Sequence, residues 1–308
     1  MMRRAPLRDW FLLLACNLIW ASQFAMVKLV QGQMGPLFAV TLPMGISTVL
    51  LFPLVRHGSI PGTDARSFLL LGIAGQVVAQ LFITWGVRLS LAANAALLSL
   101  ALPVMTAFMA YLLLGERMTP VRWVSFVLAL TGAGVCSGVD WRSLDLSGGR
   151  FVAGNVMILA SVCGSAFYNV YSKKLLIRYS PLQVLLYSYY VVCAFLVPVA
   201  VASEGRTFFD MPHFTWKVWL GLFVLATFQY FLSMVIFLNV LTRLDATQAA
   251  LSNYLIPFFG LILAALILGE RLTPMMIAGG ALVLASTLLI TTWEARSGSA
   301  IPEAERRG

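Results

Sequence analysis

The chain has 308 residues, of which 60% are hydrophobic and only 11% are charged, and its formal net charge at pH 7 is +9. Soluble domains carry roughly 25% charged residues, so this composition excludes a water-soluble globular domain. The mean hydropathy of +0.89 indicates that most of the chain lies in lipid. The four cysteines include no Cys-x-x-Cys pair and are interpreted as small buried apolar residues, so we expect no metal site.

Continuous apolar runs fill most of the sequence. A helix needs about 20 mostly apolar residues to cross a bilayer. The runs lack the alternation of barrel strands, which excludes a transmembrane β-barrel. In chain order, the predicted helices cover 9–30, 36–55, 66–89, 92–114, 121–139, 151–175, 181–202, 216–241, 246–268 and 275–293. The sequence therefore predicts an all-α integral membrane protein with ten transmembrane helices.

The N-terminal segment 1–8 is basic and precedes an apolar run that continues through Val30 without a cleavage-like break. A signal peptide would have an apolar region of about 7–15 residues that ends at small residues, so we expect an uncleaved first helix. If this helix starts in the cytoplasm, 14 of the 21 Lys and Arg residues fall on the cytoplasmic side. Such a bias predicts that both termini are cytoplasmic. The basic residues are thus explained by topology, and nucleic acid is not an expected partner.

The two halves of the chain share a repeat. Residues 90–120 and 244–274 have 13 identities in 31 aligned positions, and a weaker similarity aligns Lys28 with Lys173. A five-helix unit that starts in the cytoplasm ends outside, so its copy is inverted, as in many secondary transporters. We predict a cytoplasmic N-terminus over 1–8, a first five-helix repeat over 9–139, a connecting loop over 140–150, a second, inverted repeat over 151–293 and a cytoplasmic tail over 294–308.

The string Gly-Glu-Arg-x-Thr-Pro occurs at 115–120 and again at 269–274. Its glycines suit left-handed helix ends, its threonines suit N-caps and its prolines suit first helical positions. Helix-end chemistry thus explains the string, whereas the functional alternative makes its acidic residues, Glu116 and Glu270, gating residues. Pro103 and Pro257 occupy equivalent positions in the two halves and are candidate hinges.

The first predicted helix contains Asn-Leu-Ile-Trp-Ala-Ser-Gln-Phe at 17–24. This stretch resembles the Trp-containing opening of the drug/metabolite transporter superfamily, specifically its EamA-type exporters. The Ala-rich start, the mid-helix proline and the Leu-Gly-Glu end of 92–114 and 246–268 also resemble that family's repeat. The resemblance covers 9–293 and is greatest to the YddG-type aromatic amino-acid exporters. It implies export of amino acids or related metabolites across a prokaryotic inner membrane.

Polar side chains recur on single faces of several predicted helices, as Gln76, Gln80 and Thr84 do at a spacing of four residues. Polar groups at lipid depth are costly and usually face a cavity or another helix. Hydrogen bonds that hold helices together are the alternative explanation for each polar stripe. The candidate substrate-binding and pathway residues are Asn17, Trp20, Gln23, Gln76, Gln80, Trp85, Asn94, Ser99, Tyr168, Asn169, Tyr230, Gln248, Asn253 and Tyr254.

None of the 12 acidic residues lies in the middle third of a predicted span, which disfavours proton/cation antiport. The sequence has no phosphate-binding Gly-x-x-x-x-Gly-Lys loop, so ATP-driven transport and enzymatic activity are not expected. These features favour a secondary transporter that exports neutral amino acids and related metabolites by alternating access, as a monomer and without cofactors. A nucleotide-sugar, purine or drug carrier of the same architecture and, more remotely, a channel stay as alternatives.

Overall fold

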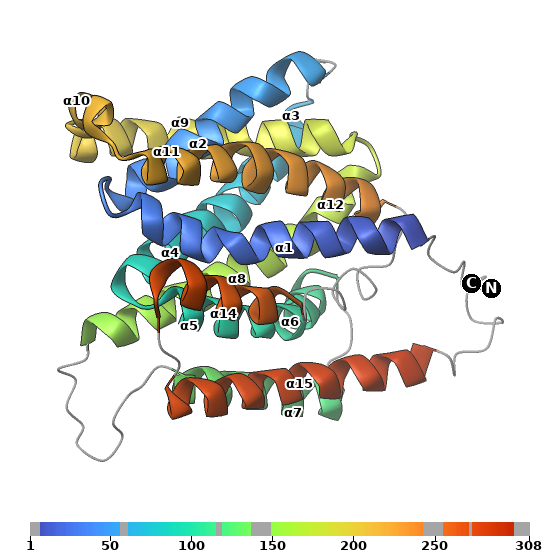
Figure 1. The fold of residues 1–308 in the computed structure, drawn as a ribbon. Helices are drawn as coiled ribbons and strands as arrows, with labels where there is room; N and C mark the ends of the chain where they lie inside the picture. The colour runs from blue at the N-terminus through green and yellow to red at the C-terminus, as the bar shows by residue number, and fades with distance from the viewer. Residues whose placement is uncertain are drawn as a thin grey trace.

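A computed structural model describes residues 7–55, 61–114, 119–136, 149–242, 255–270 and 273–298. Every regular element within these ranges is helical, and none of the described residues lies in a β-strand. The helices run roughly side by side as a bundle, with α1 beginning and α15 ending at the same end (Figure 1). The all-α fold predicted from the composition is therefore confirmed.

The described residues of the first half form five rods, three of which are built from consecutive elements. Its elements are α1 (Leu7–Val30), α2 (Pro36–Leu51), η1 (Phe52–Leu54), α3 (Gly62–Leu70), η2 (Leu71–Val77), α4 (Val78–Leu89), α5 (Ala92–Leu98), η3 (Ser99–Ala101), α6 (Leu102–Leu114) and α7 (Pro120–Cys136). The rod of α3, η2 and α4 is continuous, as is the rod of α5, η3 and α6.

The second half repeats this order, with extra short helices between the predicted helices 181–202 and 216–241. Its elements are α8 (Gly149–Leu176), α9 (Pro181–Glu204), α10 (Thr207–Asp210), η5 (Met211–His213), α11 (Trp216–Phe223), η6 (Val224–Ser233), α12 (Met234–Leu241), α14 (Leu255–Leu268) and α15 (Pro274–Gly298). The elements α11, η6 and α12 again form one continuous rod.

Seven helical stretches of the described residues are long and apolar enough to cross a membrane. They are Phe11–Val30, Pro36–Leu54, Gly62–Leu89, Ala92–Leu113, Gly149–Leu176, Pro181–Glu204 and Trp216–Leu241. Shorter apolar helices occupy Pro120–Gly132 and Pro274–Ser286, and α14 adds 14 residues of high hydrophobicity. These helices lie at the positions of the predicted spans, so the chain is a multi-pass membrane protein.

The helix-end chemistry predicted for the repeated string is present where the structure describes it. Gly269 has a φ of 67°, in the left-handed region, immediately after α14. Thr119 and Thr273 each accept a hydrogen bond from a backbone N–H three residues on, at 3.3 and 3.2 Å, and Pro120 and Pro274 begin α7 and α15. Residues 115–118, which include Glu116, lie outside the described residues.

Two of the rods contain π-helical segments, which the sequence did not predict. In η2 the N–H of Val78 bonds to the carbonyl oxygen of Ile73, five residues back. The repeat offset of 154 projects η2 onto 225–231, which lies inside the second π-helical segment, η6. π-Helical turns are rare and are frequent at functional sites. Both halves therefore depart from regular helix at the same place.

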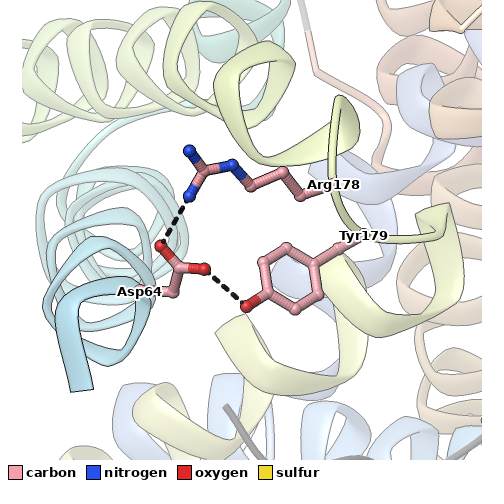
Figure 2. Close-up of polar contacts among 3 residues, drawn as sticks. All are labelled: Asp64, Arg178 and Tyr179. Atoms are coloured by element: carbon pink, nitrogen blue, oxygen red, sulfur yellow. Dashed lines mark hydrogen bonds and ion pairs between the residues drawn. The ribbon is translucent and has the colours of Figure 1, made fainter. Parts of the chain in front are cut away.

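Contacts at the helix termini distinguish the two ends of the bundle. At one end, here called the Lys28 end, the carboxylate of Glu204 accepts hydrogen bonds from the N–H groups of Leu37 and Phe38, at 3.2 and 2.9 Å. At the opposite end, the Arg178 end, Asp64 accepts a hydrogen bond of 2.7 Å from the Tyr179 hydroxyl and forms an ion pair of 3.4 Å with Arg178 (Figure 2). Each of these contacts joins the first half to the second.

Candidate substrate cavity

A cavity of about 120 Å³ lies between helices of both halves. The first half contributes α1, η2, α4, α5, η3 and α6, and the second contributes α8, η6, α12 and α14. Its lining residues are Trp20, Gln23, Phe24, Gln76, Ala79, Gln80, Ile83, Ala95, Ser99, Leu102, Ser161, Val162, Ser165, Tyr168, Asn169, Gln229, Met234, Phe237 and Ile256. None of these lining residues carries a formal charge, so the cavity is polar through amides and hydroxyls alone.

The structure brings together seven of the residues predicted to form the pathway. Trp20, Gln23, Gln76, Gln80, Ser99, Tyr168 and Asn169 all line the cavity. Asn17, Trp85, Asn94 and Tyr230 do not line it. Gln248, Asn253 and Tyr254 lie outside the described residues. Whether the seven lining residues bind a substrate stays a prediction.

The amides of the cavity bond to one another in a chain that joins three rods. Gln23 of α1 donates to the Oε1 of Gln80 at 3.0 Å, and Gln229 of η6 donates to the Oε1 of Gln23 at 2.8 Å. The hydroxyl of Tyr230 reaches the same Oε1 of Gln80 at 3.2 Å. Gln229 is 4% exposed, and its own Oε1 accepts no hydrogen bond from the described protein. The amide chain therefore ties α1, the α3–η2–α4 rod and η6 together at the cavity wall.

Aromatic side chains form the apolar wall of the cavity. The indole N–H of Trp20 donates to the hydroxyl oxygen of Ser233 at 2.9 Å, which fixes the orientation of the ring. Phe237 meets this ring edge-on, with the centroids 4.9 Å apart. The Ser233 hydroxyl in turn donates to the carbonyl oxygen of Gln229 at 2.5 Å. The aromatic wall and the amide chain are thus held by one set of hydrogen bonds.

Other predicted residues hold helices together. The side-chain amide of Asn94 donates to Ser90 and to Asn155, each at 3.2 Å, and Ser90 donates to Asn155 at 2.6 Å. This cluster ties the start of α5 to α8. Tyr230 accepts a hydrogen bond of 2.6 Å from the Tyr189 hydroxyl at its carbonyl oxygen. Thr84 bonds back to the carbonyl of Gln80 at 2.6 Å and does not line the cavity, although its spacing from Gln80 is helical.

The two candidate hinges are Pro103, which lies close to a tight helical turn, and Pro257, which lies near the start of a described range. Pro103 is the second residue of α6 and lies two residues after the tight turn η3, which contains the cavity residue Ser99. Because proline has no N–H, regular α-helical bonding cannot continue through this turn. Pro257 lies in the first turn of α14. A hinge role for either proline stays a prediction.

Several lining residues were not among those predicted. Gln229, Ser161 and Ser165 carry a signal that points to them, because each is a polar residue within a long apolar run. Ser161 also donates to the carbonyl of Ala79 at 2.6 Å, so it holds α8 to α4 while lining the cavity. Phe24, Met234, Phe237 and Ile256 give no such signal, because an apolar residue in an apolar helix is the default.

Comparison with known proteins shows similarity along most of the chain. A family model described as the EamA-like transporter family matches residues 9–138 and again residues 152–292. A "Probable terminal-alkyne amino-acid exporter" of Streptantibioticus cattleyicolor is 30% identical over 230 residues, which are 74% of this chain and 73% of that protein. A "Probable amino-acid metabolite efflux pump" of Salmonella typhimurium is 24% identical over 287 residues, 90% of this chain and 93% of that protein. One solved crystal structure shares the fold, with a TM-score of 0.63 at 17% identity, over 95% of this chain and 99% of that one.

Proposed function

Because the chain belongs to the EamA-like transporter family, we propose that it exports amino acids with neutral side chains, and related metabolites, across the inner membrane of a prokaryote. The observation that carries this proposal is the uncharged, amide-rich and aromatic cavity between the two halves. Relatives named as an amino-acid exporter and an amino-acid metabolite efflux pump support the substrate class. The chain is a transporter and not an enzyme.

The lining chemistry suits a small zwitterion with an apolar side chain. The amides of Gln76, Gln80 and Gln229 offer donors and acceptors for the polar end, and Trp20 and Phe237 pack against the apolar end. A solute with an unbalanced charge would bury that charge against neutral groups, at a cost of several kcal/mol. Nucleotides and organic cations are therefore poorer candidates than neutral amino acids.

The proposed mechanism is alternating access between the inverted repeats 9–139 and 151–293. Both repeats line the cavity, so a movement of one against the other changes which end of the bundle the cavity faces. With both termini in the cytoplasm, the Lys28 end faces outward and the Arg178 end faces inward. One chain supplies every lining residue, so a monomer suffices for transport.

Counterflow in proteoliposomes tests the proposal. Vesicles loaded with unlabelled phenylalanine are expected to take up labelled phenylalanine saturably, with the same initial rate in the presence and absence of a pH gradient, because none of the described lining residues is a carboxylate. Flux of nucleotides or organic cations without amino-acid flux would leave the fold intact and refute the substrate class. Flux that does not saturate would point to a channel.

A variant inside the cavity and a control variant outside it test whether the cavity is the substrate site. Gln80→Leu removes the acceptor shared by Gln23 and Tyr230 and is expected to lower counterflow at least about tenfold, since buried polar contacts are worth about 1–3 kcal/mol. Asn239→Leu is the matched control, because Asn239 is exposed, lines no part of the cavity and bonds only along its own helix. If the Gln80→Leu variant and the unaltered protein show equal counterflow at equal expression, Gln80 does not belong to the substrate site and the proposed placement of the site is wrong.

A further inference from the structure

Two opposite charges meet the turn between α4 and α5 at the Lys28 end. The Lys28 ammonium, from α1, donates to the carbonyl oxygens of Val87 and Ser90 at 2.7 and 2.6 Å. These carbonyls belong to the end of α4 and the residue after it. Cations are favoured at helix C-termini, where unpaired carbonyls gather. Lys28 therefore fastens the end of the α3–η2–α4 rod to α1.

The opposite charge comes from the second half. The carboxylate of Glu270 accepts hydrogen bonds from the N–H groups of Ala92 and Ala93, at 3.1 and 2.9 Å, one on each oxygen. Glu270 directly follows Gly269, whose left-handed backbone ends α14. An ionised acceptor makes these bonds stronger than neutral ones. Glu270 therefore fastens the start of the α5–η3–α6 rod to the end of α14.

This fastened turn lies directly above the cavity. Ala95 lines the cavity one helical turn below Ala92, and Ile83 lines it one turn below Val87. Gln31 of the segment after α1 adds a hydrogen bond of 2.7 Å to the carbonyl of Thr84. On the proposed alternating access, opening the cavity toward the Lys28 end parts this turn from α1 and α14. The contacts of Lys28 and Glu270 then break.

The sequence repeat gives the same charges to the opposite end. Lys28 aligns with Lys173 at an offset of 145, and Glu270 aligns with Glu116 at an offset of 154. The alanine at 92 aligns with an alanine at 246. In an inverted repeat, equivalent residues lie at opposite membrane faces. The residues of this second set at 116 and 246 lie outside the described residues.

We infer that Lys28 and Glu270 form a charge latch that holds the pathway closed at the Lys28 end. The inference rests on the proposed alternating access, and it assigns the residues that set the balance between the two states. Breaking this latch shifts the protein toward the state that is open at that end.

Glu204 provides a matched control at the same end. Its carboxylate also accepts two backbone hydrogen bonds, from Leu37 and Phe38 at the start of α2. Neither of these residues lines the cavity. The repeat offset of 145 places a serine, Ser59, at the position equivalent to Glu204, so this contact has no acidic counterpart. Glu204→Gln therefore removes the same kind of helix cap without touching the latch.

Accessibility of a cysteine in the cavity reports the state of the latch. The reporter is Ser99→Cys in a full-length chain whose four native cysteines are replaced by alanine, labelled with a membrane-impermeant maleimide in intact cells and in inside-out vesicles. Glu270→Gln is expected to accelerate labelling from outside about tenfold, because it removes the charge from two helix-terminal bonds. Glu204→Gln is expected to leave labelling from outside unchanged.

The outcomes separate the latch from a merely structural cap. Unchanged labelling in both Glu270→Gln and Lys28→Met, with correctly inserted protein, overturns the inference, as does an equal acceleration in Glu204→Gln. Acceleration that occurs only in inside-out vesicles supports the latch and reverses the orientation. The comparison of variants in this assay does not depend on which solute is carried, so an incorrect substrate assignment leaves its result unchanged, whereas counterflow detects that failure.

Discussion

Replacing Gly164 of α8 by alanine tests how closely the two halves pack beside the cavity. A Cβ at Gly164 lies 2.7 Å from the backbone nitrogen of Ala79 and 2.9 Å from the Cγ1 of Val78. Carbon contacts are favourable at about 3.5 Å, so α8 and α4 must separate by about 0.8 Å to admit the methyl group. Because the obstructing atom is backbone, no side-chain rotation relieves the contact.

The expected loss follows from two opposing terms. Overpacking costs about 1–3 kcal/mol, and alanine recovers about 0.5–1 kcal/mol because glycine is unfavourable inside a helix. Gly164→Ala should therefore lower stability by about 1–2 kcal/mol and the midpoint of thermal unfolding in detergent by a few degrees. The midpoint is measured by the reactivity of buried thiols, which Cys16 provides.

Gly45 of α2 is the control, because a Cβ there meets no heavy atom within 4 Å. Gly45→Ala replaces a glycine, which is unfavourable inside a helix, without causing a clash, and it should raise stability by about 0.5–1 kcal/mol. An equal or higher midpoint for Gly164→Ala than for Gly45→Ala would refute the packing of α8 against α4 described above.

Three further predictions concern contacts at both ends and in the cavity. The hydrogen bond to Asp64 raises the pKa of Tyr179 above its ordinary value of 10.0. The stability that this hydrogen bond contributes is therefore present below pH 10.0 and is lost as the pH rises through the raised pKa. The Tyr179→Phe variant should not show this alkaline loss of stability. Gly35→Ala places a Cβ against the carboxyl group of Glu204, and displacement of this cap should cost about 1 kcal/mol in thermal unfolding. Trp20→Phe loses the bond to Ser233, and its KM in counterflow should rise about fivefold, as a net hydrogen bond of about 1 kcal/mol implies; an unchanged KM would remove Trp20 from the site.

The sequence predicts the fold well because lipid imposes a simple rule. A span must be long, apolar and helical, so apolar runs alone locate the helices. The helix ends at Gly269, Thr119 and Thr273 follow from local backbone chemistry that needs no distant partner. The π-helical segments η2 and η6 escape prediction, because they depend on how each rod packs and not on a local residue type.

The candidate site is only partly predictable, because a polar residue in lipid has two possible partners. Asn94 and Ser99 both lie in the predicted helix 92–114, yet Asn94 bonds to Asn155 and Ser99 lines the cavity. Five residues separate them, about 140° around an ideal helix, so the spacing places them on different faces but does not say which face meets the cavity. Gln229 lines the cavity, whereas its neighbour Tyr230 does not line it and bonds to Gln80.

The bonds among Gln23, Gln80 and Gln229 have a consequence for the unloaded protein. A carrier that releases its cargo outside must reset with nothing bound, and isolated amide dipoles buried during that reset would raise its barrier. Here the side-chain oxygens of Gln23 and Gln80 already accept hydrogen bonds when no cargo is present. On the proposed mechanism, an arriving molecule exchanges these bonds instead of adding new ones, so we expect weak occupancy and an easy empty return. These properties suit export of a solute from a high cytoplasmic concentration, and do not suit uptake of a solute from a low external concentration.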